Sequence, residues 1–467
     1  MEGLLLLFPL AISLIYKEPS RYPLSILSVA TLVFTIGLSL ASKKVTTKRF
    51  YAKEGFVIVS LSWILLSFFG ALPFVLNGDI PSLVDAFFET ASGFTTTGAT
   101  VLVNVESLSY SMHFWRSFTQ LIGGMGVLVF ALAVLPKAQT ESIHILKAEV
   151  PGPSFGKLVS KLSASARILY IIYLLMTAIS ILLLWAGGLT LFESTILGFG
   201  AAATGGFSMH NGSIGIYENI YVEMVLGITM LLSGINFNLY FMLINKQFKN
   251  VLKNEEIRWF LGITAGAIIL ISINLLTQYS VADAIRHSLF TVFSVVSTAG
   301  FATVDFNQWP LFSRLILMCL MFVGGMAGST AGGLKVSRVA IMFKTALAEL
   351  KKIAYPNRVV SIHFEQKPLE KNTIHSILNY LIVYIFVFTV ILLFVSLDMP
   401  DFISAFSTVV AALNNIGNGL GVVGPASNFS IYSSFNKILL SFTMIMGRLE
   451  IFPILILFTP SIWRRKA

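Results

Sequence analysis

The sequence DAFFETASGFTTTG, from Asp85 to Gly98, is the most informative stretch of this chain because a stretch of the same type occurs four times. Each copy starts at an acidic residue, continues as an apolar run, and ends in small polar residues and a glycine. The other copies are ESTILGFGAAATGG at 193–206, DAIRHSLFTVFSVVSTAG at 283–300 and DFISAFSTVVAALNNIG at 401–417. A chain that repeats one short hairpin four times can arrange four backbone segments around a single axis, which is the geometry of an ion pore.

The composition is that of an integral membrane protein. Mean hydropathy is +0.83, and 12% of the residues are charged, against about 25% in soluble domains. The apolar part of each copy is about 10–17 residues long, too short to cross a hydrocarbon core that needs about 20 helical residues. We therefore expect four re-entrant half-helices, each followed by non-helical backbone that lines a water-filled cavity.

The predicted fold is an all-α polytopic membrane protein with ten full spans. We place the spans at roughly 3–16, 23–42, 55–77, 111–136, 166–186, 217–245, 257–278, 309–334, 374–398 and 432–460. After an N-terminal two-span hairpin (1–54), four pseudo-fourfold units follow, each made of a full span, a half-helix and a second full span, an M1–P–M2 repeat like that of potassium channels. The units are 55–136, 166–245, 257–345 and 374–467 with the C-terminal tail, and the expected cytoplasmic loops are 137–165 and 346–373.

The positive charge follows this topology. Of the 32 Lys and Arg residues, 25 fall in the segments 43–54, 137–167, 246–258, 335–371 and 464–466. By the positive-inside rule these segments and both termini lie in the cytoplasm. The net charge of +10 thus reflects orientation, and we expect no nucleic-acid partner. We expect the apolar N-terminus to be retained as a span, since it lacks a basic start and a cleavage site.

The ends of the four copies carry the predicted ion chemistry. Dehydrating a potassium ion requires several oxygens around one axis, and backbone carbonyls supply them where glycine permits the conformation. The acid that opens each half-helix caps its N-terminus, while the negative end of the helix dipole favours a cation. No ring of acids is present, which argues against a divalent-cation pore. The expected potassium ligands are Thr96, Thr97, Gly98, Thr204, Gly205, Gly206, Thr298, Ala299, Gly300, Asn415, Ile416 and Gly417.

A glycine-rich segment, GGMAGSTAGG at 324–333, interrupts the eighth predicted span. Five glycines in ten residues oppose a helix, since each costs roughly 0.5–1 kcal/mol relative to alanine. We call this segment the gate loop and expect it to line the cavity; tight packing of small residues between helices is the alternative. GSTAGGLK does not match a nucleotide-binding GxxxxGK[ST] loop. The expected gate residues are Gly324, Gly325, Gly328, Ser329, Thr330, Gly332, Gly333 and Arg448.

Arg448 belongs to this set because it is the only basic residue deep in a predicted span. An arginine at such depth is costly and faces a partner or a wet cavity; a structural ion pair between helices is the alternative. Glu450, two positions further, lies on another helical face and is not its automatic partner. Asn236 and Asn238 either line the inner cavity or join helices by hydrogen bonds.

The pattern does not indicate an enzyme. The six histidines are dispersed without HxxxH or HExxH spacing, so no histidine metal site is expected. The single cysteine, Cys319, excludes an internal disulfide.

With these motifs, nearly the whole chain resembles the Trk/Ktr/HKT superfamily of potassium-translocating proteins, specifically its Trk-type (TrkH-like) branch. We call the stretches Thr95–Thr100, Ala203–Ser208, Ser297–Thr303 and Asn414–Gly421 the four filters. The other matching segments are SGINFNLYF at 233–241, GGMAGSTAGGLK at 324–335 and MGRLEIFPILILFTP at 446–460. The N-terminal pair of spans favours the Trk over the Ktr branch. The fourth filter diverges, with Asn414 and Asn415 where the first and third have Thr or Ser. In HKT relatives a serine at the first filter glycine accompanies sodium preference, so Gly98 favours potassium.

The resemblance implies function and partners. It implies potassium uptake across a prokaryotic plasma (cell inner) membrane, with rubidium and sodium as further candidate ions, and no covalent cofactor. The gate loop would obstruct the pore below the filter, with Arg448 beside it. The chain would form a homodimer on a cytoplasmic ring of Trk-type regulatory subunits, and only those subunits would bind nucleotide. The basic segments 137–167 and 335–371 would dock that ring or contact lipid headgroups.

Three other functions remain as alternatives. A potassium symporter coupled to protons or sodium needs a titratable or sodium-binding site at mid-depth, and the filters contain no carboxylate. A polytopic membrane enzyme needs a polar catalytic cluster. A non-conducting scaffold would have no use for four glycine filters.

Overall fold

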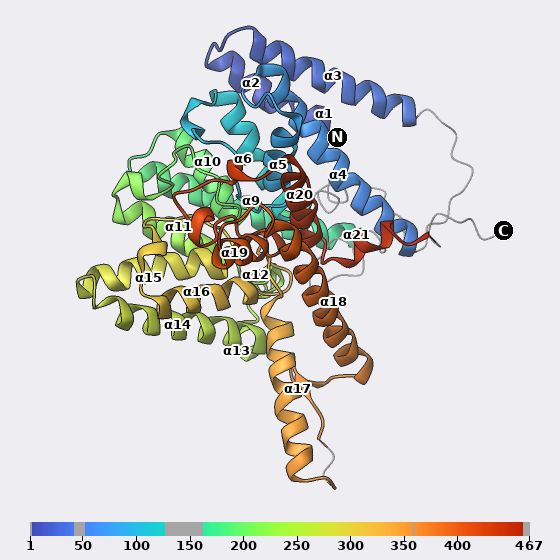
Figure 1. Ribbon diagram of the computed structural model, residues 1–467, viewed down its shortest axis with the longest axis vertical. Helices are drawn as coiled ribbons and strands as arrows, with labels where there is room; N and C mark the ends of the chain where they lie inside the picture. Colours follow the sequence, from blue (N-terminus) through green and yellow to red (C-terminus); the bar gives the residue numbers. More distant parts are fainter. Residues whose placement is uncertain (1, 42–51, 127–161, 358–359, 461–467) are drawn as a thin grey trace, which may run out of the picture.

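The computed structural model describes residues 2–41, 52–126, 162–357 and 360–460, and these are mostly helical (Figure 1). Within these residues the only strands form a two-stranded antiparallel hairpin, β1 (His363–Phe364) with β2 (Lys367–Pro368). Most of the expected loop 137–165, the end of the expected span 111–136 and the basic tail 464–466 lie outside the described residues.

The described helices fall into four units that follow an N-terminal hairpin of α1 (Glu2–Leu5), α2 (Leu7–Ile15) and α3 (Arg21–Ala41). The long first helices are α4 (Ala52–Asn77), α9 (Leu162–Ala186), α14 (Glu255–Leu275) and α18 (Lys371–Val395). The short helices are α5 (Leu83–Phe94), α10 (Leu191–Ala202), α15 (Val281–Val296) and α19 (Phe402–Leu413). The second helices are α6 (Tyr110–Gly124), α11 (Ile220–Ser233), α16 (Leu311–Val323) and α20 (Ser434–Arg448).

The remaining elements extend or connect these units. They are α12 (Phe237–Ile244), α13 (Phe248–Lys253), α17 (Val336–Ala354), α21 (Phe452–Leu457) and the 3₁₀ turns η1 (Val105–Ser107), η2 (Gly215–Tyr217), η3 (Phe306–Gln308), η4 (Gly421–Val423) and η5 (Phe429–Ile431). Figure 1 shows α17 extending away from the other helices at one end of the molecule, beside α18.

Five helices of the described residues are long and apolar enough to cross a membrane: α3, α4, α9, α14 and α18. They coincide with five of the ten predicted spans. Three of the other predicted spans are not continuous helices. The span expected at 217–245 bends by 93° between α11 and α12, and the one at 309–334 stops at Val323. The one at 432–460 breaks between α20 and α21, where Glu450 and Ile451 have positive φ.

The start of each short helix is capped by a side chain. Ser82, Thr190 and Ser280 accept the backbone N–H of the acid three residues later. Asp401 is itself the cap and accepts the N–H of Ser404, so the fourth acid lies one turn earlier than its supposed counterparts. Hydrogen bonds from the side chain and backbone of Ser404 hold the pKa of Asp401 below its ordinary value, which keeps the cap charged.

The end of each short helix is also the same in all four units. The second residue after the helix adopts a left-handed conformation, with φ between 54° and 60° at Thr96, Thr204, Thr298 and Asn415. The next N–H then bonds back across the last turn, as from Thr97 to the Ser92 carbonyl at 2.9 Å. This Schellman-type ending stops the helix and turns the chain abruptly.

The four units close into a circle. The short helix of each unit packs against the second helix of the preceding one: α10 against α6, α15 against α11, α19 against α16, and α5 against α20. The last pair joins the fourth unit to the first. The ends of the four short helices are therefore held around a common centre.

Close backbone packing at this centre predicts a difference between two glycines. A Cβ on Gly123 of α6 would lie 1.7 Å from the Phe94 carbonyl oxygen, whereas a Cβ on Gly262 of α14 would meet nothing within 4 Å. We expect Gly123→Ala to lower the thermal unfolding midpoint of the purified protein, because a clash with backbone outweighs the roughly 1 kcal/mol by which alanine favours a helix. Gly262→Ala, the matched control, should leave the midpoint unchanged or raise it. Equal midpoints for both variants would contradict the packing.

Candidate functional site

The four ring glycines, Gly98, Gly206, Gly300 and Gly417, lie where the short helices converge. All four have positive φ, from 75° to 88°, a conformation that glycine adopts without strain. A Cβ added to Gly98, Gly206, Gly300 or Gly417 would lie 2.1, 1.9, 2.1 or 2.5 Å from the carbonyl oxygen of Gly205, Ala299, Ile416 or Thr97, respectively. Each glycine thus touches the carbonyl of the next unit, and the fourth touches the first.

This order brings all twelve of the predicted filter residues together around one ring. Thr96, Thr97, Thr204, Thr298, Ala299, Asn415 and Ile416 are at most 1% exposed. The backbone contributes oxygens from four units at the negative ends of four short helices. Such an arrangement can replace the hydration shell of a monovalent cation.

Side chains hold this backbone differently in each unit. Gln120 of α6 donates from Nε2 to the Gly205 carbonyl at 2.7 Å and accepts the N–H of Phe207 at 3.3 Å. Asn415 donates from Nδ2 to Thr97 Oγ1 at 2.9 Å and to the Met444 carbonyl at 2.8 Å. The divergent asparagine of the fourth unit therefore ties that unit to the first.

A buried ion pair that the sequence analysis missed lies beside the first and second filters. Arg116 Nε is 2.6 Å from Glu89 Oε1, and both side chains are at most 3% exposed. Glu89 also accepts the Val101 N–H at 3.0 Å. Arg116 Nη1 donates to the Ser208 carbonyl at 3.0 Å, and the guanidinium lies 3.5 Å from the Phe207 ring centre. The pair thus joins the backbone that follows Gly98, at Val101, to the backbone that follows Gly206, at Ser208.

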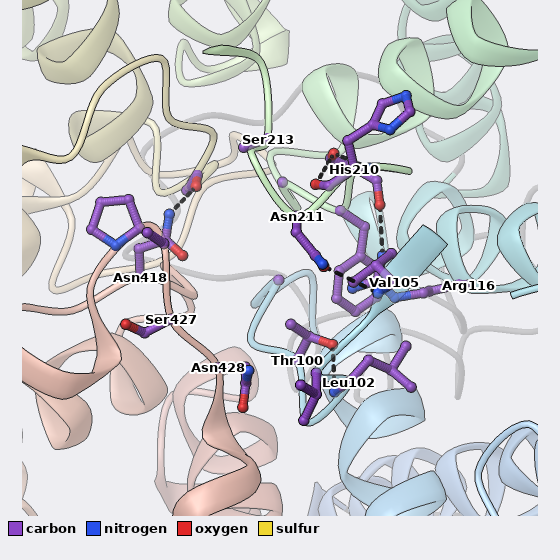
Figure 2. A pocket seen from close by; sticks show the side chains of 18 residues that line it. Thr100, Leu102, Val105, Arg116, His210, Asn211, Ser213, Asn418, Ser427 and Asn428 are labelled. Carbon is purple, nitrogen blue, oxygen red and sulfur yellow. Dashed lines mark hydrogen bonds between the residues drawn. The ribbon is translucent and has the colours of Figure 1, made fainter. Parts of the chain in front are cut away.

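A cavity of about 150 Å³ opens beyond the ring (Figure 2). The cavity is lined by three ring glycines, Gly98, Gly206 and Gly300, and by Asn418. The other lining residues include members of 100–105, 207–213 and 425–428, which come after the ring glycines in the sequence. Asn418 donates to the Gly300 carbonyl, as Figure 2 shows. One face of the ring is therefore open to a polar cavity.

The gate loop lies on the opposite face and is not helical, which rules out the alternative of small residues packing a continuous helix. Thr330 Oγ1 donates to the carbonyls of Ala202 at 3.2 Å and Ser233 at 3.1 Å. The Gly332 N–H donates to Thr298 Oγ1 at 2.6 Å. The loop therefore touches the ends of α10 and α15.

The loop glycines permit this close approach. A Cβ on Gly332 would lie 2.2 Å from the Asn414 carbonyl oxygen, and one on Gly325 would lie 3.1 Å from the Gly234 carbonyl oxygen. Gly324, Gly328 and Gly333 have positive φ. Among the other predicted gate residues, Ser329 lies inside the loop and donates to the Met326 carbonyl at 2.6 Å.

Arg448 reaches the loop from the end of α20. Its Nη1 donates to the Thr330 carbonyl and its Nη2 to the Gly123 carbonyl, both at 2.7 Å, and Nη2 also contacts the Gly124 carbonyl. The residue is 6% exposed. A buried guanidinium thus fastens the loop to the end of α6.

The neighbouring polar residues have other partners. Glu450 accepts from Arg338 of α17. Asn236 caps α12 by accepting the Asn238 N–H at 2.9 Å, and a Cβ on Gly328 would lie 3.0 Å from its Oδ1. Asn236 therefore faces the gate loop, a position that its sequence context alone did not determine.

Comparison with known proteins gives concordant matches. The family model TrkH, described as cation transport protein, matches residues 25–465. The Trk system potassium uptake protein TrkH of Escherichia coli K12 is 39% identical over 420 residues, which cover 88% of this chain and 86% of that protein. The Trk system potassium uptake protein TrkG of the same strain is 35% identical, with coverage of 99% and 96%. The crystal structure of the potassium transporter TrkH from Vibrio parahaemolyticus superposes with a TM-score of 0.87 at 32% identity, with coverage of 99% and 96%.

The Glu89–Arg116 pair generates a stability prediction. We expect Glu89→Ala and Arg116→Ala each to lower stability by about 3–5 kcal/mol, because each leaves a buried charge without its partner. The double variant should lose less than the sum of the two. Thermal unfolding midpoints of the purified proteins measure the effect, and the exposed pair Glu349–Lys352 supplies control variants with little change. Additive losses would show that the two charges do not interact.

Proposed function

The chain belongs to the TrkH family of cation transport proteins, as its motifs predicted, and from this we propose that it takes up potassium through a channel-like pore in the cell inner membrane. The family is one of transporters and not of enzymes. The observation that carries the proposal is the closed circle of four glycines, each against the carbonyl of the next unit.

The chemistry of the ring supports potassium as the ion. The segments around the ring glycines offer backbone carbonyls and small hydroxyls, which suit a weakly hydrated monovalent cation. The carboxylate nearest in sequence to the first filter, Glu89, is paired with Arg116. An inside-negative potential would favour entry by about 2.3 kcal/mol per 100 mV for each charge.

The gate loop and Arg448 would close this pore on the cytoplasmic side. The loop lies against the ends of α10 and α15 through Thr330 and Gly332. The Arg448 guanidinium places a positive charge below the ring, which opposes the passage of a cation. Opening requires the loop to leave these contacts.

We assign the partners from the family pattern. Two copies of the chain would form a homodimer in the cell inner membrane, with both termini in the cytoplasm. A ring of Trk-type regulatory subunits would bind nucleotide and act on the gate from below. The expected docking segment 335–371 contains α17, whose basic residues Lys351 and Lys352 are exposed.

The first prediction concerns ion flux through the purified protein in liposomes. We expect Arg448→Ala to carry rubidium or potassium down an imposed potential, without a proton or sodium gradient, at a rate at least about tenfold above wild type, because a bond from a charged donor is worth more than 1.4 kcal/mol. Lys249→Ala, which removes an exposed cation of α13, is the control and should stay at the wild-type rate. Flux that appears only with a proton or sodium gradient would contradict the channel-like pore and support the coupled symporter.

The second prediction concerns selectivity. Gly98→Ser places a Cβ against the Gly205 carbonyl, 2.1 Å away, at a φ of 82°, so we expect the ratio of potassium to sodium permeability to fall. Gly78 has the same φ and nothing within 4 Å of a Cβ, so Gly78→Ser is the matched control. Reversal potentials under mixed gradients, measured in the Arg448→Ala background, give the ratio. An unchanged ratio in Gly98→Ser would argue against this ring as the filter.

A further inference from the structure

A buried carboxylate outside the predicted site holds the gate loop from below. Glu256, in the first turn of α14, is 4% exposed. Its Oε1 accepts the N–H of Ala327 in the loop at 2.8 Å and the N–H of Ser337 in the first turn of α17 at 3.1 Å. One oxygen thus joins the middle of the loop to the helix that follows it.

The helix that carries Glu256 is itself capped by the β1–β2 hairpin. Glu365, in the turn of that hairpin, accepts the N–H groups of Glu255 and Glu256 at 3.0 and 3.1 Å. In return, the Glu365 N–H donates to the Glu255 carboxylate at 3.3 Å. The Glu365 carboxylate therefore connects the hairpin to the start of α14, and the Glu256 carboxylate connects the start of α14 to the gate loop.

The hairpin also contacts the helix on the other side of the loop. Phe364 is 1% exposed and clusters with Ala340 and Ile341 of α17. Lys344 of α17 donates to the His363 carbonyl at 2.8 Å and pairs with Glu255. The hairpin therefore bridges α14 and α17 next to the gate loop.

The turn of the hairpin is held in an uncommon conformation. Glu365 and Gln366 both have positive φ, 51° and 61°, where a two-residue turn usually carries Asn or Gly. Non-glycine residues remain in this region only where their surroundings hold them. The bonds from the α14 N-terminus to Glu365 are contacts of that kind.

We propose that Glu256 is a positioning residue that latches the gate loop in its obstructing position, and that the hairpin 363–368 controls this latch through Glu365. The proposal rests on the proposed role of the loop as a gate. A partner that moves the hairpin would shift the α14 N-terminus and Glu256 with it. The loop would then lose its bond at Ala327, while Met326 and Gly328 keep their backbone bonds to Gly234 and Phe237 and Arg448 still holds Thr330.

The experiment measures two quantities on the purified full-length chain in liposomes. The first is rubidium uptake at a fixed potential. The second is the rate at which an impermeant thiol reagent labels Ala327→Cys in a Cys319→Ser background. Glu256→Gln and Glu256→Ala break or weaken the latch, and Glu365→Ala tests the hairpin. Glu349→Gln is the control, since this exposed α17 carboxylate pairs with Lys352.

We expect Glu256→Ala to raise both rates roughly tenfold, because a bond to a charged acceptor is worth about that factor. Glu256→Gln and Glu365→Ala should raise them less. The ratio of rubidium to sodium uptake should stay constant, since the ring is unchanged; a general loss of structure would change it. Glu349→Gln should match wild type.

The two proposals fail in different ways. Labelling rates that do not rise in Glu256→Ala and Glu365→Ala overturn the latch, whether or not the protein conducts. If neither wild type nor Arg448→Ala carries rubidium, the proposed pore fails, and the labelling rates alone decide the latch.

Discussion

The contact between each ring glycine and the carbonyl oxygen of the next unit is the constraint on which the rest of the structure depends. No side-chain carbon fits at any of the four positions, so the four backbones approach one another directly. The caps fix where each short helix begins, and the left-handed residue after it fixes where it ends. Two of the second helices come equally close: a Cβ on Gly447 of α20 would lie 2.2 Å from the Leu413 carbonyl oxygen, and one on Gly123 of α6 would lie 1.7 Å from that of Phe94.

At the gate loop, hydrogen bonds from charged side chains add to the close packing of the loop glycines. Arg448 and Glu256 hold the gate loop from two sides, the cation through the Thr330 carbonyl and the anion through the Ala327 N–H. Each bonds to backbone, which suits a segment whose glycines leave few side chains to hold. Backbone hydrogen bonds of Met326, Gly328 and Thr330 to the segment 233–237 hold the loop at further points.

The circular arrangement could be expected from the sequence, because the short apolar run and the glycine that follows it are local features that recur four times. The breaks in the second helices at Gly234 and Ile451 were less evident, since hydropathy continues across them. The Glu89–Arg116 pair and the anchor at Glu256 could not be found, because their partners lie 27 and 71 residues away. Asp401 misled the alignment of the fourth copy, since an acid serves equally as cap or as first-turn residue.

Because one chain supplies all four quadrants, a single substitution alters only a quarter of the ring. In a symmetric tetramer the same change would appear four times at once. Asn415 is an example. It stands where the other three units have threonine, and its side chain donates a hydrogen bond to Thr97, which joins the fourth unit to the first. A ring encoded in one chain can therefore change one quadrant at a time.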